Sequence, residues 1–430
     1  ATVETVCTVA GIVEQHAAAL NNFTDEIQSM RMRFSDTKNV TCASTDLLAI
    51  AAVKSTANIA IKPAARVTSL GTALGAGTRR NASQINKRLV AFCKRRSRFK
   101  RLRFTGIHTD KLLRTGGIAG MTFGQKPIGV SCSTLLKQRR AASAAAYVHS
   151  CGGDLDLSLL IADGVSKGAA DPAFEAHVGV LHMWSLAIWE NWLPRALLES
   201  VVKSTSVRLS RASSVWNNVY GPAAAAVATA GRIGWQFISA ADIITDQGTS
   251  IDLKVESPAY LKGEVVLAVG RWRWRNIEAK FPSLDSHGQG LGAAWRPVLK
   301  VLRAKESNEW SKEHKGALKS LICGRQWPQS RLAKAGYVQD STCRLCRGVV
   351  GGDQPGTLRH RLVCPSLGPF REKHMPNFLH ELLGRHGIEL GSTMLLAFTR
   401  GLFPASPPPA RKSDGYDTFI WLTTAREIPL

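Results

Sequence analysis

Four residues in the last quarter of the sequence have the types and spacing of a metal site. Cys343 and Cys346 form a Cys-x-x-Cys pair, a spacing that lets two thiolates from one tight turn reach a single Zn²⁺. His360 and Cys364 are four positions apart, which places both on one face of a helical turn. Together they predict a closed, tetrahedral and structural Zn²⁺ site, against the alternative of four unrelated residues that happen to fall close together.

The residues around these ligands predict how they are positioned and what surrounds them. RGVVGGDQPGTLR, between the two pairs, is rich in Gly and Pro, which is typical of a loop that brings the pairs together. Arginines next to the ligands predict a positive face for phosphate; they are Arg344, Arg347, Arg359 and Arg361.

The same region resembles a known family. HKGALKSLICGRQWPQSRLAKAGYVQDSTCRLCRG, followed by GTLRHRLVCPSL, is similar to the C-terminal region of non-LTR (LINE-type) retrotransposon reverse transcriptases. The direct resemblance covers only His314 to Leu367. The positions that match the family pattern are Trp327, Arg331, Ala335, Gly336, Cys343, Cys346, Thr357, His360, Cys364 and Pro365.

The resemblance implies that the first part of the chain is the end of a polymerase palm. RMRFSDTKNVTCAS is similar to the segment after the catalytic aspartates, and there Lys38 would lie near the phosphates of the incoming nucleotide. Leu70 and Gly71 would correspond to the hairpin that grips the primer terminus. A surface lysine and a plain β-turn are the alternatives.

A strongly basic run follows, from Arg79 to Arg103, without any acidic residue. Its cations are Arg79, Arg80, Lys87, Arg88, Lys94, Arg95, Arg96, Arg98, Lys100, Arg101 and Arg103. Helical spacing predicts one apolar stripe, formed by Ile85, Leu89, Phe92, Cys93 and Phe99, and Ser83 is the predicted cap. Uncompensated cations repel one another, which favours an RNA or template-primer contact over a solvated basic face. In the family this region is the thumb.

Other patterns predict structure before chemistry. Trp184, Ile188 and Trp192 recur at helical spacing, which indicates a core stripe. Asp154, in GGDLDL, is expected to cap a helix and not to bind a metal. RWRWR would place arginines and tryptophans on opposite faces if it formed a strand, and Asp242 with Asp246 would share a helix face.

The carboxylates of a polymerase are missing. Nucleotidyl transfer needs acidic residues that hold two divalent metals, and reverse transcriptases carry them on a Tyr-x-Asp-Asp turn. The sequence contains no Asp-Asp pair and no GxxxxGK phosphate loop. This chain alone is therefore predicted to be inactive, with Mg²⁺ needed only in an intact polymerase that supplies the missing N-terminal half.

Charge and cysteine content bound the partners and the compartment. Against 56 Lys and Arg there are 32 Asp and Glu, a formal net charge of +24, which favours RNA, DNA or an RNA/DNA hybrid as partner. No apolar run is long enough for a membrane span. Nine cysteines without a signal peptide indicate a reducing, intracellular compartment, nuclear or cytoplasmic, and not secretion.

These patterns predict a mainly α fold with a small β part. The expected segments are a palm end with a grip-like hairpin (1–78), a basic helical thumb-like domain (79–220), a connector (221–320), a helical segment with the zinc knuckle (321–402), and a Pro-rich linker with the truncated start of a further domain (403–430). A stand-alone basic zinc-knuckle protein and a decayed, inactive retroelement remnant stay open as alternatives.

Overall fold

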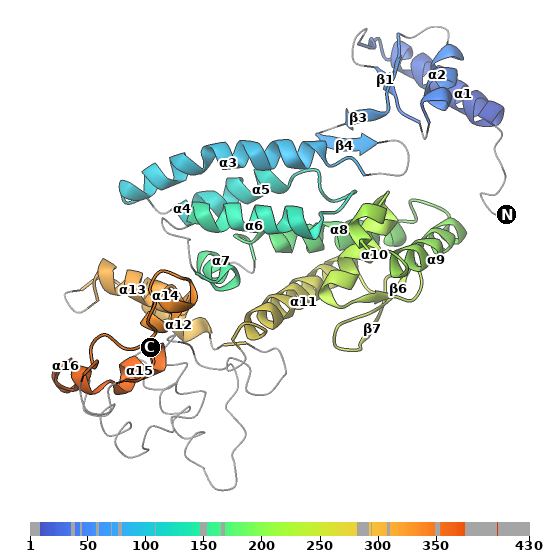
Figure 1. Cartoon of the computed structure of the whole chain (residues 1–430). Coiled ribbons are helices and arrows are strands. Elements are labelled where there is room, and N and C mark those ends of the chain that lie inside the picture. Colours follow the sequence, from blue (N-terminus) through green and yellow to red (C-terminus); the bar gives the residue numbers. More distant parts are fainter. Residues whose placement is uncertain are drawn as a thin grey trace. The chain divides into compact units, whose positions relative to one another are not determined.

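The computed structural model describes residues 9–35, 39–43, 45–56, 60–69, 71–75, 80–107, 109–146, 153–164, 168–281, 292–293, 295–307, 310–348, 353–374 and 402. These residues are mainly helical with three small sheets, which confirms the predicted fold class (Figure 1). A search of the described helices found none that is long and apolar enough to cross a membrane. The chain divides into two compact units, Ala1–Val148 with Ser166–Val269, and His149–Val165 with Gly270–Leu430.

The first unit begins with two helices and two small sheets. Its first elements are α1 (Val9–Ser29), β1 (Val40–Thr41), α2 (Asp46–Lys54), β2 (Lys62–Pro63), β3 (Arg66–Ser69) and β4 (Thr72–Gly75). α2 packs against α1 and against both strands of the parallel pair β1–β2. β3 and β4 are antiparallel, and Ser69 pairs with Thr72 across the turn. The hairpin expected around Leu70 and Gly71 is therefore present.

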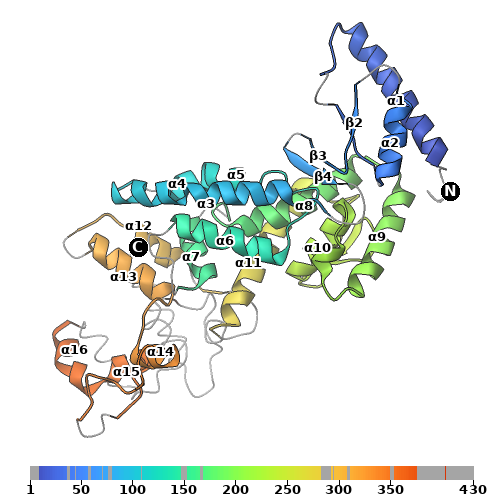
Figure 2. The ribbon, with the colours of Figure 1, turned by 45° about the horizontal axis from the view of Figure 1, so that its top comes forward.

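A layer of helices follows the hairpin. Its elements are α3 (Ser83–Phe104), α4 (Thr109–Leu112), the π-helical turn η1 (Leu113–Gly117), α5 (Ile118–Thr122) and α6 (Cys132–Ala146). α3 lies alongside α5 and α6 in both views of the ribbon (Figures 1 and 2). Leu113 and Met121 are fully buried within this layer, because the interrupted helix α4–η1–α5 turns its apolar side toward α3 and α6.

The next helices of this unit form its apolar centre. They are α8 (Pro172–Trp189), α9 (Arg195–Ser210), the short η2 (Val215–Asn218) and α10 (Pro222–Ile233), with α10 packed on α8 and α9. Asp171 caps α8 by accepting from the Ala173 amide at 3.0 Å. α10 starts with Pro222 and is followed by Gly234, whose φ of +86° suits a residue without a Cβ.

The tryptophan stripe is only partly buried. Trp184 and Ile188 lie in the core of the first unit, as predicted, but Trp192 is 52% exposed. The helix ends at Trp189, and Asn191 takes a positive φ of 52°, so the helical spacing does not continue to Trp192. The indole Nε1 of Trp192 donates a hydrogen bond to the Glu190 carboxylate.

A three-stranded antiparallel sheet replaces the helix expected around Asp242 and Asp246. It consists of β5 (Gln236–Phe237), β6 (Asp242–Ile244) and β7 (Ser250–Asp252). The turn between β6 and β7 is closed by the Thr249 carbonyl, which accepts from the Thr245 amide at 2.9 Å, and Gly248 takes a positive φ of 80°. The turn sequence and the cross-strand pairing of two buried isoleucines, Ile243 and Ile251, favour a hairpin here.

α11 (Pro258–Glu278) contains RWRWR, so this stretch is helical and does not form the strand that was considered for it. Leu261, Val265, Val269 and Ile277 are fully buried at helical spacing along it. The helical spacing of these buried residues extends over most of the segment, so it decides the structure over the alternation within the five residues of RWRWR. Its residues up to Val269 belong to the first unit and the rest to the second.

The second unit contains mostly short helices. Besides the end of α11 they are α7 (Leu155–Asp163), α12 (Trp295–Arg303), α13 (Lys312–Ile322), α14 (Gln329–Lys334), α15 (Leu358–Val363), the 3-10 turn η4 (Pro365–Leu367) and α16 (Gly368–His374). Asp154 caps α7 by accepting from the Leu157 amide at 2.9 Å, as predicted. Its carboxylate and that of Asp156 also accept from Lys280 Nζ, at 2.7 and 3.1 Å.

Candidate metal centre and basic helix

The four predicted ligands come together in the second unit. The thiols of Cys343, Cys346 and Cys364 and a ring nitrogen of His360 all lie within 4.8 Å of one another. Cys343 Sγ is 3.9 Å from Cys364 Sγ, and Cys346 Sγ is 3.2 Å from His360 Nε2. All four side chains are buried, with exposures between 0 and 8%. A metal ion can therefore be enclosed by four protein ligands, without an open position for substrate.

Local backbone structure places each pair of ligands. Cys343 precedes a turn that contains Cys346, and the Cys343 amide donates to Gln354 O at 2.9 Å, next to the isolated bridge between Thr342 and Pro355. His360 lies in α15, and Cys364 is the residue that ends this helix. This arrangement bears out the helical step expected for the second pair.

Hydrogen bonds at the start of α15 join it to the rest of the centre. Thr357 caps the helix by accepting from the His360 amide at 3.0 Å. The Gly356 carbonyl accepts from the Ser330 amide of α14 at 3.1 Å. A Cβ on Gly356 would lie 2.7 Å from the Gln329 Cβ, so a side chain here would push α14 away from the ligands.

Three thiols in one buried cluster influence one another's protonation. Burial raises the pKa of Cys346 to about 11, and the neighbouring thiols Cys343 and Cys364 add to this shift. At Cys343 the effect of burial is outweighed by hydrogen bonds from the Leu345 and Cys346 amides, which bring its pKa below the ordinary value. Several thiolates in one buried cluster repel one another, so the centre disfavours deprotonating more than one thiol. A divalent cation bound by thiolates and an imidazole removes this electrostatic cost.

The surface of the centre is basic and carries exposed aromatic residues. Arg344, Arg347 and Arg361 are exposed as expected, whereas the side chain of Arg359 lies outside the described part. Arg347 Nη2 lies 3.3 Å from Asp340 Oδ2. The Arg331 guanidinium stacks 4.4 Å from the Trp327 ring, so two positions of the family pattern are in contact.

The basic helix α3 buries the stripe that its spacing predicts. Ile85, Leu89 and Phe92 are buried and Phe99 is half-buried, but Cys93 is exposed. Cys93 is one residue away from Phe92, a rotation of about 100°, which takes it off the stripe. Ser83 does not cap the helix: its amide donates to Asn81 Oδ1 at 3.2 Å, so Asn81 supplies the acceptor.

The predicted cations of α3 separate into two groups. Seven are exposed and have no ion-pair partner among the residues described; they are Lys87, Lys94, Arg95, Arg96, Arg98, Lys100 and Arg101. Arg80, Arg88 and Arg103 instead bind backbone carbonyls within the first unit. Arg79 lies outside the described residues. Lys87, Lys94, Arg98 and Arg101 fall within about 60° of arc opposite the buried stripe.

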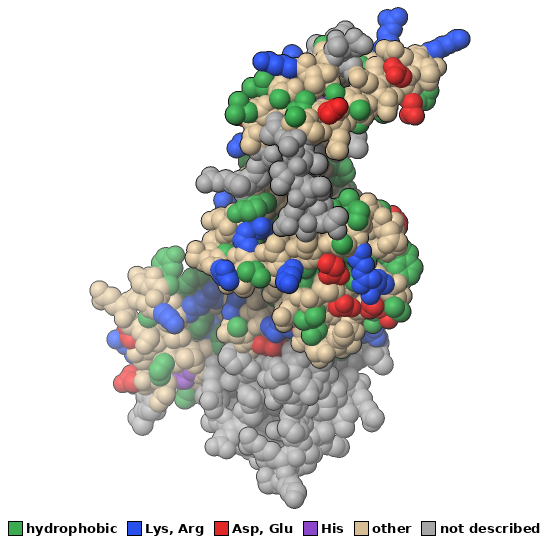
Figure 3. Space-filling model, turned by 90° about the vertical axis from the view of Figure 1, so that its right-hand side faces the viewer, with side chains coloured by type: hydrophobic (Ala, Val, Ile, Leu, Met, Phe, Trp, Pro, Cys, Tyr) green, Lys and Arg blue, Asp and Glu red, His purple; other side chains and the backbone are tan. Residues whose placement is uncertain are grey.

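Some other exposed cations of the first unit have acidic neighbours. Arg195 lies 3.8 Å from Glu199, and Lys254 lies 3.6 Å from Asp252. On the face drawn in Figure 3, Lys and Arg side chains similarly lie next to Asp and Glu side chains in several places. α3 differs because it contains no acidic residue along its 22 positions.

Arg88 fixes the β3–β4 hairpin to the helical layer. Its Nη1 donates to Phe123 O at 2.5 Å, and its guanidinium lies 4.8 Å from the Phe123 ring centroid. A Cβ on Gly71 would lie 2.6 Å from Arg88 Nη2, and one on Gly124 would lie 2.9 Å from Gly71 O. The positive φ of Gly71 and this close packing both favour glycine. Leu70 and Lys38 lie outside the described residues.

Buried polar pairs were not anticipated from the sequence. In the first unit Arg139 donates to both carboxylate oxygens of Asp171, at 2.9 and 2.8 Å, and both residues are buried. In the second unit Arg273 lies 3.0 Å from Asp163. Arg273 is an inward-facing arginine of RWRWR, whereas Arg275 is exposed, because two helical positions differ by about 200°.

The fold and the site define a mainly helical protein with a closed, buried Cys₃His metal centre and a strongly basic helix. Comparisons with protein-family models, curated proteins and solved structures found no match. The contacts and charges of the chain itself therefore carry the functional argument.

Proposed function

We propose that the protein binds nucleic acid, as RNA, DNA or an RNA/DNA hybrid, through the exposed cations of α3. The single observation that carries this proposal is the row formed by Lys87, Lys94, Arg98 and Arg101, opposite the buried stripe and free of carboxylates. From Lys87 to Arg101 the row extends about 21 Å, at about 1.5 Å per residue. This length corresponds to about six base-pair steps of 3.4 Å, so the row can follow one phosphate backbone.

The side chains of this row favour a backbone contact over base readout. Exposed lysines and arginines spaced along one face neutralise phosphates and release counterions, which gives affinity without sequence preference. Arg80, Arg88 and Arg103 are not part of the binding surface in this proposal. They hold the helix against the hairpin and α6 instead.

We further propose that the chain is part of a non-LTR retrotransposon reverse transcriptase and that the ion in the Cys₃His centre is Zn²⁺. The sequence pattern from Trp327 to Pro365 and the contact between Trp327 and Arg331 support the first statement. Three thiols and one imidazole are a donor set that suits Zn²⁺. The role proposed for α3 is to hold the template-primer, since the sequence has no Asp-Asp pair for nucleotidyl transfer.

The test is the salt dependence of binding to a labelled RNA/DNA duplex, measured by fluorescence anisotropy. Substituting Gln for the four residues of the row should lower the slope of log K against log salt by up to about 3.6 for a duplex, or about 2.8 for a single strand. The matched control removes four exposed cations elsewhere in the first unit, Lys203, Arg211, Lys254 and Lys262, for an identical change in net charge. Equal losses in the two variants would reduce the effect to net charge and contradict a specific role for α3.

A further inference from the structure

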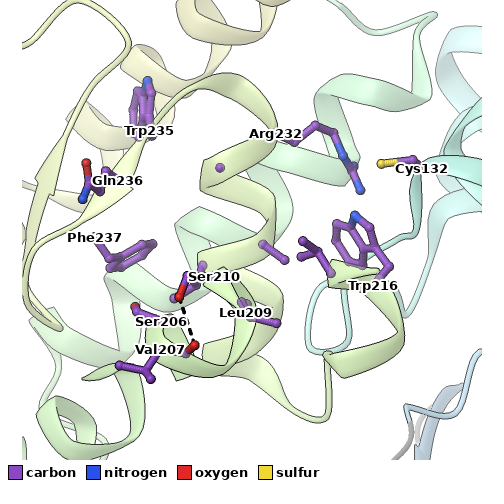
Figure 4. A pocket seen from close by; sticks show the side chains of 14 residues that line it. Cys132, Ser206, Val207, Leu209, Ser210, Trp216, Arg232, Trp235, Gln236 and Phe237 are labelled. Carbon is purple, nitrogen blue, oxygen red and sulfur yellow. Dashed lines mark hydrogen bonds between the residues drawn. The ribbon is translucent and has the colours of Figure 1, made fainter. Parts of the chain in front are cut away.

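A second candidate site lies in the first unit, where α9, η2, α10 and β5 meet the start of α6 (Figure 4). The pocket has a volume of about 830 Å³, within the range of small-molecule sites. Its walls are mostly apolar and aromatic, and no acidic residue lines it. It does not include the exposed cations of α3.

One end of the pocket is cationic, because Arg232 lines it and Arg80, which does not line it, contacts the same Trp216 ring. The guanidinium groups of Arg232 and Arg80 lie 4.4 and 5.2 Å from the Trp216 ring centroid. Arg80 donates to Gly129 O at 3.1 Å, and Arg232 donates to the next carbonyl, Val130 O. Nε and Nη1 of Arg232 are buried and have no hydrogen-bond partner in the part of the chain that the structure describes. Two guanidinium groups are thus held together without a carboxylate.

Burial makes this charge pair costly. Desolvation lowers the pKa of Arg232, and the charge of Arg80 lowers it further, while the Cys132 thiol opposes this shift. Burial also lowers the pKa of Arg80. An anion bound beside them would relieve both effects.

The start of α6 adds partial positive charge to the same end of the pocket. Cys132 is the first residue of this 15-residue helix, and Ser131 Oγ accepts from the Thr134 amide at 3.3 Å. The helix N-terminus carries a partial positive charge and amide groups that lack carbonyl partners within the helix. Arg232 reaches toward Cys132 and Trp216 in Figure 4, so the guanidinium and the helix terminus face one region.

The other side of the pocket suits a planar apolar group. Trp235, Gln236 and Phe237 lie across from Arg232 (Figure 4). Ser206 and Ser210, on α9, line the same space. Aromatic walls that also carry an amide and hydroxyl groups suit a nucleobase and its sugar.

We propose that this pocket binds a nucleoside phosphate, with the phosphate at Arg232 and the α6 N-terminus and the base against the aromatic wall. The ligand is either a free nucleotide or the phosphorylated end of a strand, since both present this chemistry. Binding here does not require the α3 row. The two sites can therefore fail independently.

The experiment titrates the full-length chain with AMP, GMP, CMP and UMP, and separately with inorganic phosphate, by calorimetry. We expect nucleotide binding that Arg232→Met weakens at least 10-fold and that the four α3 substitutions leave unchanged. Arg211→Met, an exposed arginine at the end of α9 that does not line the pocket, is the matched control. Absence of nucleotide binding, unchanged affinity in Arg232→Met, or equal affinity for phosphate and nucleotides would overturn the proposal.

A measurement on the unaltered protein guards against misfolding of the variant. Alkylation of Cys132 by iodoacetamide, followed peptide by peptide, should slow when UMP or AMP is bound, whereas the exposed Cys93 should react as before. Equal rates at Cys132 with and without saturating nucleotide would contradict the site. Competition by a 5′-phosphorylated oligonucleotide, but not by its unphosphorylated form, would identify the strand end as the ligand, and failure of both to compete would identify the free nucleotide.

Discussion

The guanidinium of Arg88 lies 4.8 Å from the ring of Phe123 and donates a hydrogen bond to the carbonyl of that same residue. One cation of the basic run thus joins α3 to the loop after α5, and it packs on Gly71 of the hairpin. A residue counted with the nucleic-acid surface on charge alone therefore has a structural role.

Arg88→Met should destabilise the first unit by about 1–3 kcal/mol, because the Phe123 carbonyl loses its donor and the ring loses its cation. Urea unfolding measures the change. Lys87→Met, one position earlier and exposed, is the control and should stay within about 0.5 kcal/mol of the unaltered protein. Equal effects of the two substitutions would mean that Arg88 is only another surface cation.

Cys346→Ser should abolish stoichiometric metal binding, because the closed centre then keeps only three of its four ligands. The measurement is metal content by mass spectrometry, together with the melting temperature before and after chelation. In the unaltered protein we expect one zinc per chain and a lower melting temperature once it is removed. Cys93→Ser, at an exposed thiol outside the centre, should change neither quantity.

His177 should make the first unit sensitive to acid. Burial, reinforced by the charge of Arg232, lowers its pKa from 6.5 to about 3, so the folded protein keeps the imidazole neutral where the unfolded chain binds a proton. Stability contributed by the neutral form is complete above pH 6.5 and falls as the pH drops toward 3. For one proton the slope approaches about 1.4 kcal/mol per pH unit.

The unfolding free energy of His177→Gln, measured between pH 7 and 4, should fall less steeply than that of the unaltered protein. Parallel curves for the unaltered protein and His177→Gln would show that His177 does not remain neutral in the fold.

Arg273 and Asp163 should each mainly compensate the buried charge of the other and add little net stability as a pair. Arg273→Met leaves the Asp163 carboxylate buried without this partner, and we expect a loss of about 3–5 kcal/mol. The double variant with Asp163→Leu should recover much of that loss, since no charge then stays uncompensated. Denaturant unfolding of the two single variants and the double variant gives the coupling, and additive losses would rule out a direct interaction.

Local patterns in the sequence determined the metal centre, the hairpin turn and the apolar stripe of α3. Cys-x-x-Cys and His-x-x-x-Cys fix ligand geometry within a turn each, and Ile85, Leu89 and Phe92 follow the helical period, so neighbours along the chain suffice to predict them. The predictions for Cys93, Ser83 and Trp192 were wrong. Cys93 lies one position off the buried stripe, and Ser83 and Trp192 lie near a helix start and beyond a helix end, where small differences in backbone geometry decide burial and capping.

Tertiary structure alone decided what each charged residue does. Arg80, Arg88 and Arg103 bind carbonyls supplied by Gly129, Phe123 and Ala145, which are distant in sequence, whereas the neighbouring Lys87 and Lys94 remain exposed. RWRWR could not be assigned from five residues, because the burial that makes it helical extends over all of α11. A cation's partner depends on which backbone groups the fold brings near it, and sequence spacing holds no information about those.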